Sequence, residues 1–248
     1  MGYEGPALYI HALEHIRRMK GSSRPHLMRC SDNGYYIVKF QGNPQGARTP
    51  ANDLFGSLLA RELRLPVPAC GVIDVDERLI KLSHEVHPDF ELCPSPCRPG
   101  FSFGSRYASV QPSAAGTGPA VLMDYLKPDQ LLHVTNRTDF IGVLVFDNWT
   151  CNKDTRQFVY DRDAERETWR AKMVDQGLCF NGDSWCFREP LTTSSFSASI
   201  PFDSITGIES FEPWLHCLES EIDITDLEKC AREVPPEWYQ SAIGRLTD

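Results

Sequence analysis

Two acidic loops follow one another in the middle of the chain. The first reads DNWTCNKD (Asp147–Asp154) and comes after the apolar run Phe140–Phe146. The second reads MVDQGLCF (Met173–Phe180) and ends a β-like stretch in Asp-x-Gly. Carboxylate and amide oxygens of such loops are suited to binding hard cations and the phosphates that accompany them. The two loops therefore predict a site for metal and phosphate.

Length and charge exclude several classes of protein. With 248 residues the chain can bury a substantial core, either as one large domain or as a small two-lobed enzyme. The formal charge of -9 argues against direct binding of nucleic acid or of an anionic membrane. No apolar run reaches the ~20 residues of a membrane span, and the N-terminus lacks a charged segment followed by an apolar core. We therefore expect a soluble cytoplasmic protein.

The cysteines do not form a recognisable framework. There are nine, an odd number, and no Cys-x-x-Cys pair occurs. Cys93 and Cys97 flank Pro-Ser-Pro and resemble half of a zinc site, but no second half with ligand spacing follows. Reduced thiols in a cytosolic protein are the expected state.

The first part of the chain has the pattern of a small β-rich lobe with one helix. Residues 7–20 suit either a helix or a strand. Leu27–Cys30 and Tyr35–Phe40 flank the turn Ser31–Gly34, and Asn-Gly between β-rich runs is the strongest short-range hairpin signal. The spacing of the leucines predicts a helix over Ala51–Arg64, ended by a proline.

The pattern then becomes less regular. Ala69–Asp74 and Arg78–Leu82 predict a second antiparallel pair. Residues 83–118 are rich in Pro, Gly and Ser and predict a long loop or insertion, of a kind that often has a function. Ala120–Leu126 is strand-like again and is interpreted as a connection between two lobes.

The second part of the chain is predicted to be mainly helical. Thr138–Phe146 is expected to form a helix, and Gln157–Asp161 with Arg170–Val174 a hairpin. The tail is expected to be helical over Phe211–Trp214 and Ile222–Ala231. Together the two parts predict an α+β protein.

A strand lysine followed by two acidic loops resembles the HipA-like kinase family and, more distantly, the phosphatidylinositol kinases. The lysine is Lys39, in YYIVKF, and the resemblance runs from about Ala12 to Trp238. It implies a two-lobed, protein-kinase-like α+β fold forming one domain over 1–248. The β-rich N-lobe would cover 1–120, including the loop 83–118, and the mainly helical C-lobe 121–248.

The resemblance also implies a nucleotide site in the N-lobe. GSSRP (Gly21–Pro25), with Ser22 and Ser23, matches the loop that covers the phosphates. Lys39 matches the lysine that holds them, and Asp53 the helix acid that pairs with this lysine. The family usually has Glu at the position of Asp53.

Two further motifs complete the implied nucleotide and metal sites. MDYL matches a hinge whose backbone binds adenine, and it consists of Met123, Asp124, Tyr125 and Leu126. DQGL resembles the magnesium loop of these kinases closely, which makes Asp175 the principal metal ligand.

The catalytic loop admits two registers. NKDTRQ, ending at Gln157, matches the beginning of Asn-x-Asp-Arg and makes Asp154 the first choice for catalytic acid. The family has Asn five residues after this Asp, where this chain has Val159, so Gln157 must substitute or one metal ligand is missing. The other register uses Asp147 with Asn152, which have the Asp-x-x-x-x-Asn spacing.

Two hypotheses follow. The resemblance implies an ATP-dependent kinase that uses Mg²⁺ and phosphorylates Ser or Thr of an unidentified protein; the wider family also suggests an antitoxin-like or regulatory partner. The alternative is a pseudokinase, favoured by Asp53, by Val159 and by the small size. Singly, each residue also has an ordinary explanation, as an edge lysine or a turn former. The three signals in this order favour the kinase.

Overall fold

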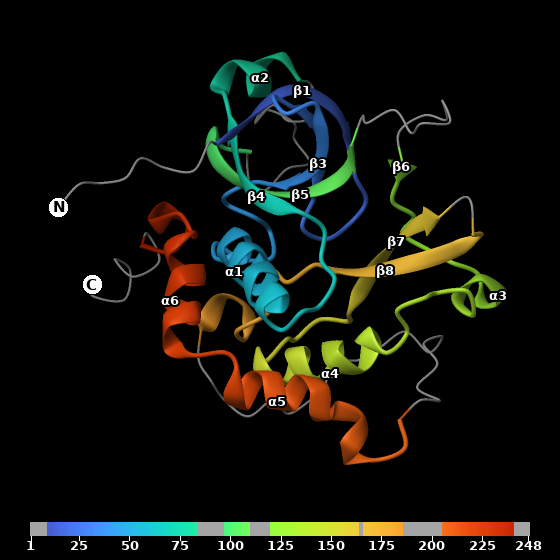
Figure 1. Cartoon of the computed structure of the whole chain (residues 1–248). Helices are drawn as coiled ribbons and strands as arrows, with labels where there is room; N and C mark the ends of the chain where they lie inside the picture. The colour runs from blue at the N-terminus through green and yellow to red at the C-terminus, as the bar shows by residue number, and fades with distance from the viewer. Residues whose placement is uncertain (1–8, 84–96, 110–119, 164–165, 186–204, 241–248) are drawn as a thin grey trace.

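The computed structural model describes residues 9–83, 97–109, 120–163, 166–185 and 205–240. The described part is β-rich in its first half and largely helical in its second (Figure 1). Its strands are β1 (Ile10–Arg18), β2 (His26–Cys30), β3 (Gly34–Lys39), β4 (Cys70–Val75), β5 (Gly100–Ser109), β6 (Ala120–Val121), β7 (Gln157–Asp163) and β8 (Thr168–Val174). Its α-helices are α1 (Thr49–Glu62), α2 (Glu77–Leu82), α3 (Pro128–Leu131), α4 (Asp139–Trp149), α5 (Glu212–Ser220) and α6 (Ile224–Arg232).

The strands of the first half form a closed sheet. β1 pairs antiparallel with β2 and parallel with β4, and β3 pairs antiparallel with β2. β5 pairs antiparallel with both β3 and β4 and so closes the ring, which Figure 1 shows end-on. The short β6 extends from β5. A closed sheet has no open edge along these strands, which protects them from pairing with other chains.

Apolar side chains fill the interior of this closed sheet and leave little space between the strands. Those that are buried are Ala12, Met28, Cys30, Tyr36, Val38, Phe40, Ile73, Val75 and Ile80. A Cβ atom added at Gly104 of β5 would lie 2.3 Å from Cγ1 of Ile73. Glycine at this position therefore leaves room for the buried side chain of Ile73.

Several predicted elements are confirmed. Residues 10–18, which suited a helix or a strand, form β1. The Asn-Gly hairpin is β2 and β3, and Asn33 adopts the left-handed φ of 58° that its turn requires. The predicted helix over 51–64 is α1, which starts two residues earlier, at Thr49.

The prediction of a strand over Arg78–Leu82 is wrong, because this segment lies in α2. The side chain of Asp76 accepts a hydrogen bond of 2.6 Å from the Arg78 amide and caps the helix. Lys81 and Glu77 form an ion pair one turn apart. These local polar contacts favour a short helix, which is too brief to show a helical period in the sequence.

The expectation of a loop over 83–118 is also wrong for its middle part, where β5 lies. The predicted loop residues 84–96, including Cys93, and 110–119 are outside the described part of the chain. The strand-like run 120–126 is regular only in β6, and Met123 then pairs with Tyr160 in a single bridge. Strand β5 has serines and glycines in a segment that is nevertheless paired on both sides, so its composition hid it.

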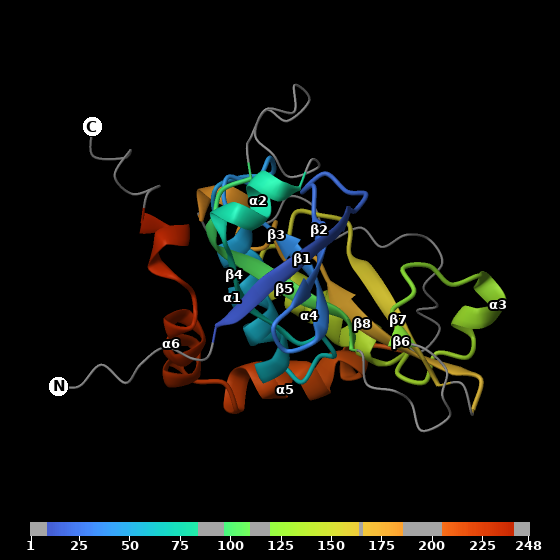
Figure 2. The ribbon, with the colours of Figure 1, turned by 90° about the horizontal axis from the view of Figure 1, so that it is seen from above.

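The second half packs below the closed sheet, as Figures 1 and 2 show. α4 and the hairpin of β7 and β8 form as predicted, and the predicted tail helices correspond to α5 and α6. The main core joins α1 to this half and is made of Leu59, Ala60, Leu63, Leu65, Val143, Phe146, Met173, Cys179, Phe180, Cys217 and Cys230. No described helix combines the length and the apolar character needed to cross a membrane.

Candidate active site

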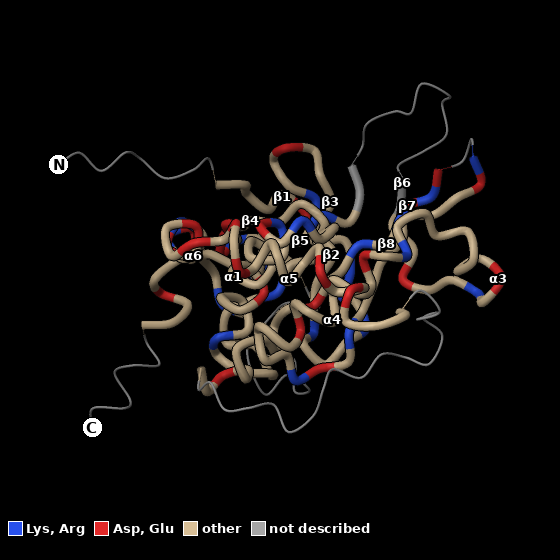
Figure 3. Tube along the Cα trace, turned by 60° about the horizontal axis from the view of Figure 1, so that its bottom comes forward, with Lys and Arg blue, Asp and Glu red and all other residues tan. Residues whose placement is uncertain are grey.

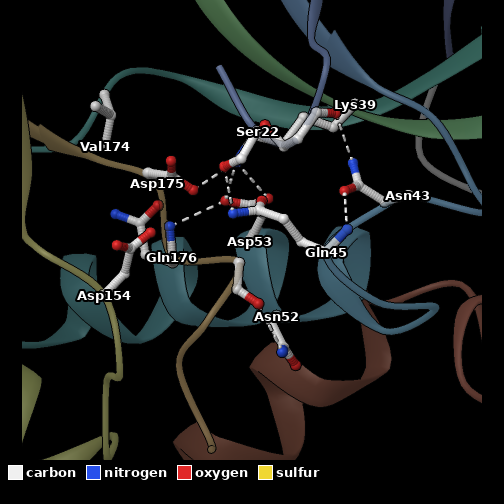
Figure 4. Close-up of polar contacts among 12 residues, drawn as sticks. Ser22, Lys39, Asn43, Gln45, Asn52, Asp53, Asp154, Val174, Asp175 and Gln176 are labelled. Carbon is white, nitrogen blue, oxygen red and sulfur yellow. Dashed lines mark hydrogen bonds and ion pairs between the residues drawn. The ribbon is translucent and has the colours of Figure 1, made fainter. Parts of the chain in front are cut away.

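Lys39 lies between two carboxylates that come from distant parts of the chain (Figure 4). Its Nζ atom donates to both oxygens of Asp53, at 3.1 and 2.8 Å. The same atom donates to Oδ1 of Asp175 at 2.7 Å. Lys39 is the last residue of β3, Asp53 lies in α1, and Asp175 follows β8 directly. The fold thus brings together three of the residues that the sequence analysis selected.

Burial and charge together set the protonation of this group. Burial alone would lower the pKa of Lys39, but the carboxylates of Asp53 and Asp175 outweigh it and raise this pKa above its ordinary value. Burial, together with the charge of Asp175, raises the pKa of Asp53 to about 6 although Lys39 opposes the change. Burial would also raise the pKa of Asp175, but Lys39 and Arg156 hold it below its ordinary value. Lys39 and Asp175 therefore form the firmly charged pair.

The group keeps limited access to solvent through Asp175. The Asp175 side chain is 18% exposed, whereas those of Lys39 and Asp53 are 8% and 1% exposed. Basic residues (Lys and Arg) and acidic residues (Asp and Glu) are interspersed along the rest of the trace (Figure 3). The electrostatics of the site therefore come from this local group and not from a surface of one sign.

Side chains of helix α1 bond to the main chain of the Asp175 loop. The Gln176 amide donates to Oδ1 of Asp53 at 2.9 Å, and Nδ2 of Asn52 donates to the Gly177 carbonyl at 2.9 Å. A Cβ atom added at Gly177 would lie 2.8 Å from Cγ2 of Thr49. The Asp-x-Gly pattern thus has a steric reason, because only glycine allows the loop to lie this close to α1.

The segment after this loop is fixed to the beginning of α1. Asp183 accepts a hydrogen bond of 2.7 Å from the Arg48 amide, and Nε1 of Trp185 donates to Oδ1 of Asn52 at 2.7 Å. The Arg48 guanidinium lies 4.5 Å from the centre of the Trp185 ring. α1 therefore positions the loop on both sides of Gly177.

Asp154 lies in a turn that is joined to the Asp175 loop. The Lys153 amide donates to the Leu178 carbonyl at 3.2 Å, and the Phe180 amide donates to the Thr150 carbonyl at 2.6 Å. Asp154 is partly exposed, and its Oδ1 accepts from the Thr155 amide at 2.8 Å. The two acidic loops therefore lie side by side, and Asp154 is partly exposed to solvent.

The alternative register with Asp147 as catalytic acid is not compatible with the structure. The Asp147 side chain is completely buried and forms an ion pair with Arg156, which is also completely buried. Asp147 lies in the last turn of α4, below the turn that carries Asp154. It cannot contact a substrate hydroxyl, whereas Asp154 is accessible from solvent. Spacing alone did not distinguish the two because it contains no information on burial.

The candidate metal ligands other than Asp175 are less favourably placed. Nδ2 of Asn152 donates to the Asp154 carbonyl at 3.1 Å, and its Oδ1 accepts from the Asp154 amide at 3.3 Å. Asn152 thus shapes its own turn. Gln157 is exposed at the start of β7, and Val159 two residues later is apolar. Within the described ranges no cluster of three His, Cys, Asp or Glu side chains is arranged to hold a metal ion.

The predicted phosphate-covering loop, Gly21–Pro25, connects β1 to β2. Oγ of the exposed Ser22 accepts from Nε2 of Gln45 at 2.9 Å, and the carbonyl of the buried Ser23 accepts from Nδ2 of Asn43 at 3.0 Å. Figure 4 shows these contacts beside the Lys39 group. The loop is thus held by the segment between β3 and α1, which the sequence analysis did not select.

The predicted hinge is only partly available for a ligand. The amide and carbonyl of Met123 both bond to Tyr160 of β7, at 3.0 and 2.7 Å. The Met123 backbone is therefore already paired, which contradicts its expected role in adenine binding. Asp124 and Tyr125 are exposed, and Leu126 is buried in the core next to β7 and α3.

Two residues of the site were missed. Asn52 and Arg156 bond to main-chain carbonyls of the second acidic loop, but neither was predicted as a site residue: Arg156 occurs within NKDTRQ and Asn52 within the predicted helix 51–64. Asn52 directly precedes Asp53, and Arg156 follows Asp154 by two residues. Their position next to these acids was the available signal. It was not sufficient, because the partner of Asn52 lies more than a hundred residues away and the partners of Arg156 lie across the hairpin of β7 and β8.

Comparisons with known proteins identify the family and the fold. The profile of the HipA-like kinase family matches residues 13–159. A solved structure of the Helicobacter pylori proinflammatory kinase CtkA is similar with a TM-score of 0.55 at 11% identity, covering 94% of this chain and 90% of that one. A Golgi casein kinase is similar with a TM-score of 0.49 at 12% identity, covering 95% and 71%. Curated protein sequences include no match.

The fold is that of the protein kinases, with a β-rich N-terminal part and a helical C-terminal part. The family match covers more than half of the chain, and the chain belongs to the HipA-like kinase family. The match ends at residue 159, before Asp175, whereas the sequence analysis expected the resemblance to extend to Trp238. The position of Asp175 is therefore known from the structure and not from the family match.

Proposed function

We propose that this kinase-family protein transfers the γ-phosphoryl group of ATP to a Ser or Thr hydroxyl of a protein, in the cytoplasm. The observation that carries the proposal is the buried Lys39 between Asp53 of α1 and Asp175 of the Asp-x-Gly loop. A lysine that is held by a helix acid and lies beside the acid of an Asp-x-Gly loop is the arrangement with which protein kinases bind ATP and its metal. We divide the domain into an N-lobe over 1–120 and a C-lobe over 121–248.

The residues present fit a hard cation such as Mg²⁺. Asp175 offers a charged carboxylate that is partly exposed, and only its Oδ1 is bonded to Lys39. Asn152 or Gln157 would supply an amide oxygen as a second ligand. A bound divalent cation would neutralise phosphate charge during transfer. Oxygen donors of this kind suit Mg²⁺, and also Mn²⁺, better than a metal that prefers nitrogen or sulfur ligands.

The chain itself would position both substrates. Lys39 would bind a phosphate oxygen, with Asp53 keeping its ammonium group in place. Because the amide and carbonyl of Met123 bond to Tyr160, adenine would be bound by main-chain groups of the exposed residues that follow, Asp124 and Tyr125. Asp154 would accept a hydrogen bond from the acceptor hydroxyl and orient it. Transfer would depend on positioning and on charge neutralisation.

A pseudokinase is the second candidate function. It is favoured by Val159 at the position of the usual metal-binding Asn and by the amide of Asn152, which already bonds to its own turn. In that case the chain would bind nucleotide or a regulatory protein partner, for example of the antitoxin kind, without transferring phosphate. The accessible Asp154 beside the Asp175 loop favours the active kinase.

Transfer from labelled ATP in the presence of Mg²⁺ tests the proposal. Wild type is expected to label itself or a protein in a host-cell lysate, and Asp175→Asn is expected to abolish the label. Asp161→Asn is a matched control, because Asp161 pairs with Lys172 within the hairpin of β7 and β8 and contacts no residue of the site. Folded wild type that binds ATP without any transfer would favour the pseudokinase. A label that persists in Asp175→Asn would contradict the proposed metal ligand.

A further inference from the structure

Arg156 and Asp147 form an ion pair below the two acidic loops. Both side chains are 0% exposed, and two nitrogens of the guanidinium, Nε and Nη2, bond to the carboxylate. The third nitrogen, Nη1, donates to the carbonyls of Val174 and Asp175, each at 3.0 Å. One buried guanidinium thus bonds to the end of α4 and to the backbone on which Asp175 stands.

Stability alone is a weak explanation for such a pair. Taking two charges out of water is unfavourable, and well-packed apolar residues often replace a buried ion pair without loss of stability. An apolar pair could not donate to the Val174 and Asp175 carbonyls. The specific consequence of a guanidinium at this place is therefore the position of the Asp175 backbone.

The Asp175 backbone needs support because it is in an unfavourable conformation. Its φ is 64°, in the left-handed region that residues other than glycine rarely adopt. Arg156 holds its carbonyl, Lys39 its carboxylate, and Asp53 the amide of the following residue. These contacts fix the direction in which the carboxylate points.

The same guanidinium is also close in the chain to the turn that carries Asp154. Arg156 is two residues after Asp154, and Asp147 precedes this turn. Because Arg156 bonds to the Val174 and Asp175 carbonyls, it links the turn of Asp154 to the backbone of Asp175.

We propose that Arg156, held by Asp147, is a positioning residue that fixes Asp175 and Asp154 relative to each other and so determines metal affinity. This inference rests on the proposed function, in which Asp175 binds the metal. It assigns no contact with substrate to Arg156 or to Asp147.

The test is the affinity for Mn²⁺, measured by electron paramagnetic resonance with a non-hydrolysable ATP analogue. Arg156→Lys keeps the charge but cannot bond at once to the carboxylate and to both carbonyls, so we expect affinity to fall by about 10–100-fold, as for other residues that support metal ligands. Arg61→Lys is the control, because Arg61 also donates to a carbonyl, that of Pro68 at 3.1 Å, but away from the site. It is expected to leave Mn²⁺ affinity unchanged.

Thermal unfolding is recorded first, and affinities are compared only where each variant is folded. If Arg156→Lys does not fold, Asp147→Asn takes its place, since it keeps the guanidinium but removes its charged partner. Unchanged Mn²⁺ affinity in the folded variant would overturn the inference. Failure of the proposed function is distinguishable, because wild type would then transfer no phosphate or Asp175→Asn would bind Mn²⁺ as wild type does.

Discussion

At the scale of single residues, the site depends on one lysine that faces two acids. The order of Lys39, Asp53 and Asp175 in the sequence was enough to predict that they meet, because the same order occurs in the kinases that the sequence resembles. Asp154 was preferred to Asp147 because Asp147 lies at the end of an apolar helix, but the spacing of Asp147 to Asn152 also suits a catalytic acid and did not exclude it. Only the buried partner Arg156 shows that Asp147 is structural.

Replacing Lys39 should destabilise the fold as well as the site. Lys39→Met leaves two buried carboxylates facing each other, and breaking a buried pair in this way lowers the free energy of unfolding by about 3–5 kcal/mol. Lys172→Met is the control, because Lys172 and Asp161 are partly exposed and such pairs contribute roughly 0–1 kcal/mol. Urea unfolding measures both. Equal losses in the two variants would contradict the account of the Lys39 group.

A methyl group at Gly177 should disturb the Asp175 loop. In Gly177→Ala the new Cβ would lie 2.8 Å from Cγ2 of Thr49 and 3.2 Å from Oδ2 of Asp53, and overpacking of this kind destabilises by about 1–3 kcal/mol. Gly71→Ala is the matched control, since nothing lies within 4 Å of its added Cβ. Thermal unfolding and phosphate transfer are compared. The result that would contradict the prediction is a Gly177→Ala protein as stable and active as Gly71→Ala.

At the scale of elements, local signals predicted local structure. The Asn-Gly hairpin and helix α1 follow from turn chemistry and from leucine spacing, which depend on neighbouring residues. Strand β5 could not be predicted, because its pairing with β3 and β4 joins segments far apart and its glycines and serines resemble a loop. α2 was mistaken for a strand because its six residues are too few to show a helical period.

The closed sheet contains a histidine that should make stability depend on pH. His26 of β2 is buried, and burial, then His15 and Arg18 of β1, lower its pKa from 6.5 to about 4. Nδ1 of His26 lies 3.0 Å from Nε2 of His15, and its Nε2 lies 3.9 Å from Sγ of Cys97. The folded protein therefore disfavours a proton on His26.

The sign follows from the two pKa values. Between pH 6.5 and about 4 the unfolded chain binds a proton at His26 that the folded chain does not, so the free energy of unfolding falls as pH falls, by up to about 3 kcal/mol. Above pH 6.5 His26 contributes no pH dependence. His26→Gln should flatten the profile over this range in urea unfolding at a series of pH values. Parallel profiles for variant and wild type would refute the role of His26.

At the scale of the whole molecule, the kinase fold was predicted from the order of its motifs. The two-part α+β arrangement is confirmed, and family membership is established over residues 13–159. The closure of the sheet and the attachment of the C-terminal helices to the N-terminal part could not be predicted. Both depend on contacts between distant segments, to which a local pattern is insensitive.

A tryptophan that follows helix α6 packs against the N-terminal part of the protein. Trp238 is 2% exposed and packs with Ala51, Leu54 and Phe103, and its Nε1 donates to the Phe101 carbonyl at 3.0 Å. Trp238→Ala should lower the free energy of unfolding by about 3–5 kcal/mol. Trp238→Phe keeps most of the packing but loses the hydrogen bond and should lower it by about 1 kcal/mol. Chemical denaturation that finds Trp238→Ala as stable as wild type would contradict this packing role.

The central claim is that the Lys39 group and Asp154 form one phosphoryl-transfer site. The most direct measurement is phosphate transfer by Asp154→Ala, together with its affinity for ATP and Mg²⁺. We predict that transfer falls by about 10²–10⁴-fold, the usual contribution of a general base, while nucleotide affinity stays close to that of wild type because Lys39 and Asp175 are intact. Transfer by Asp154→Ala at the wild-type rate would contradict the claim.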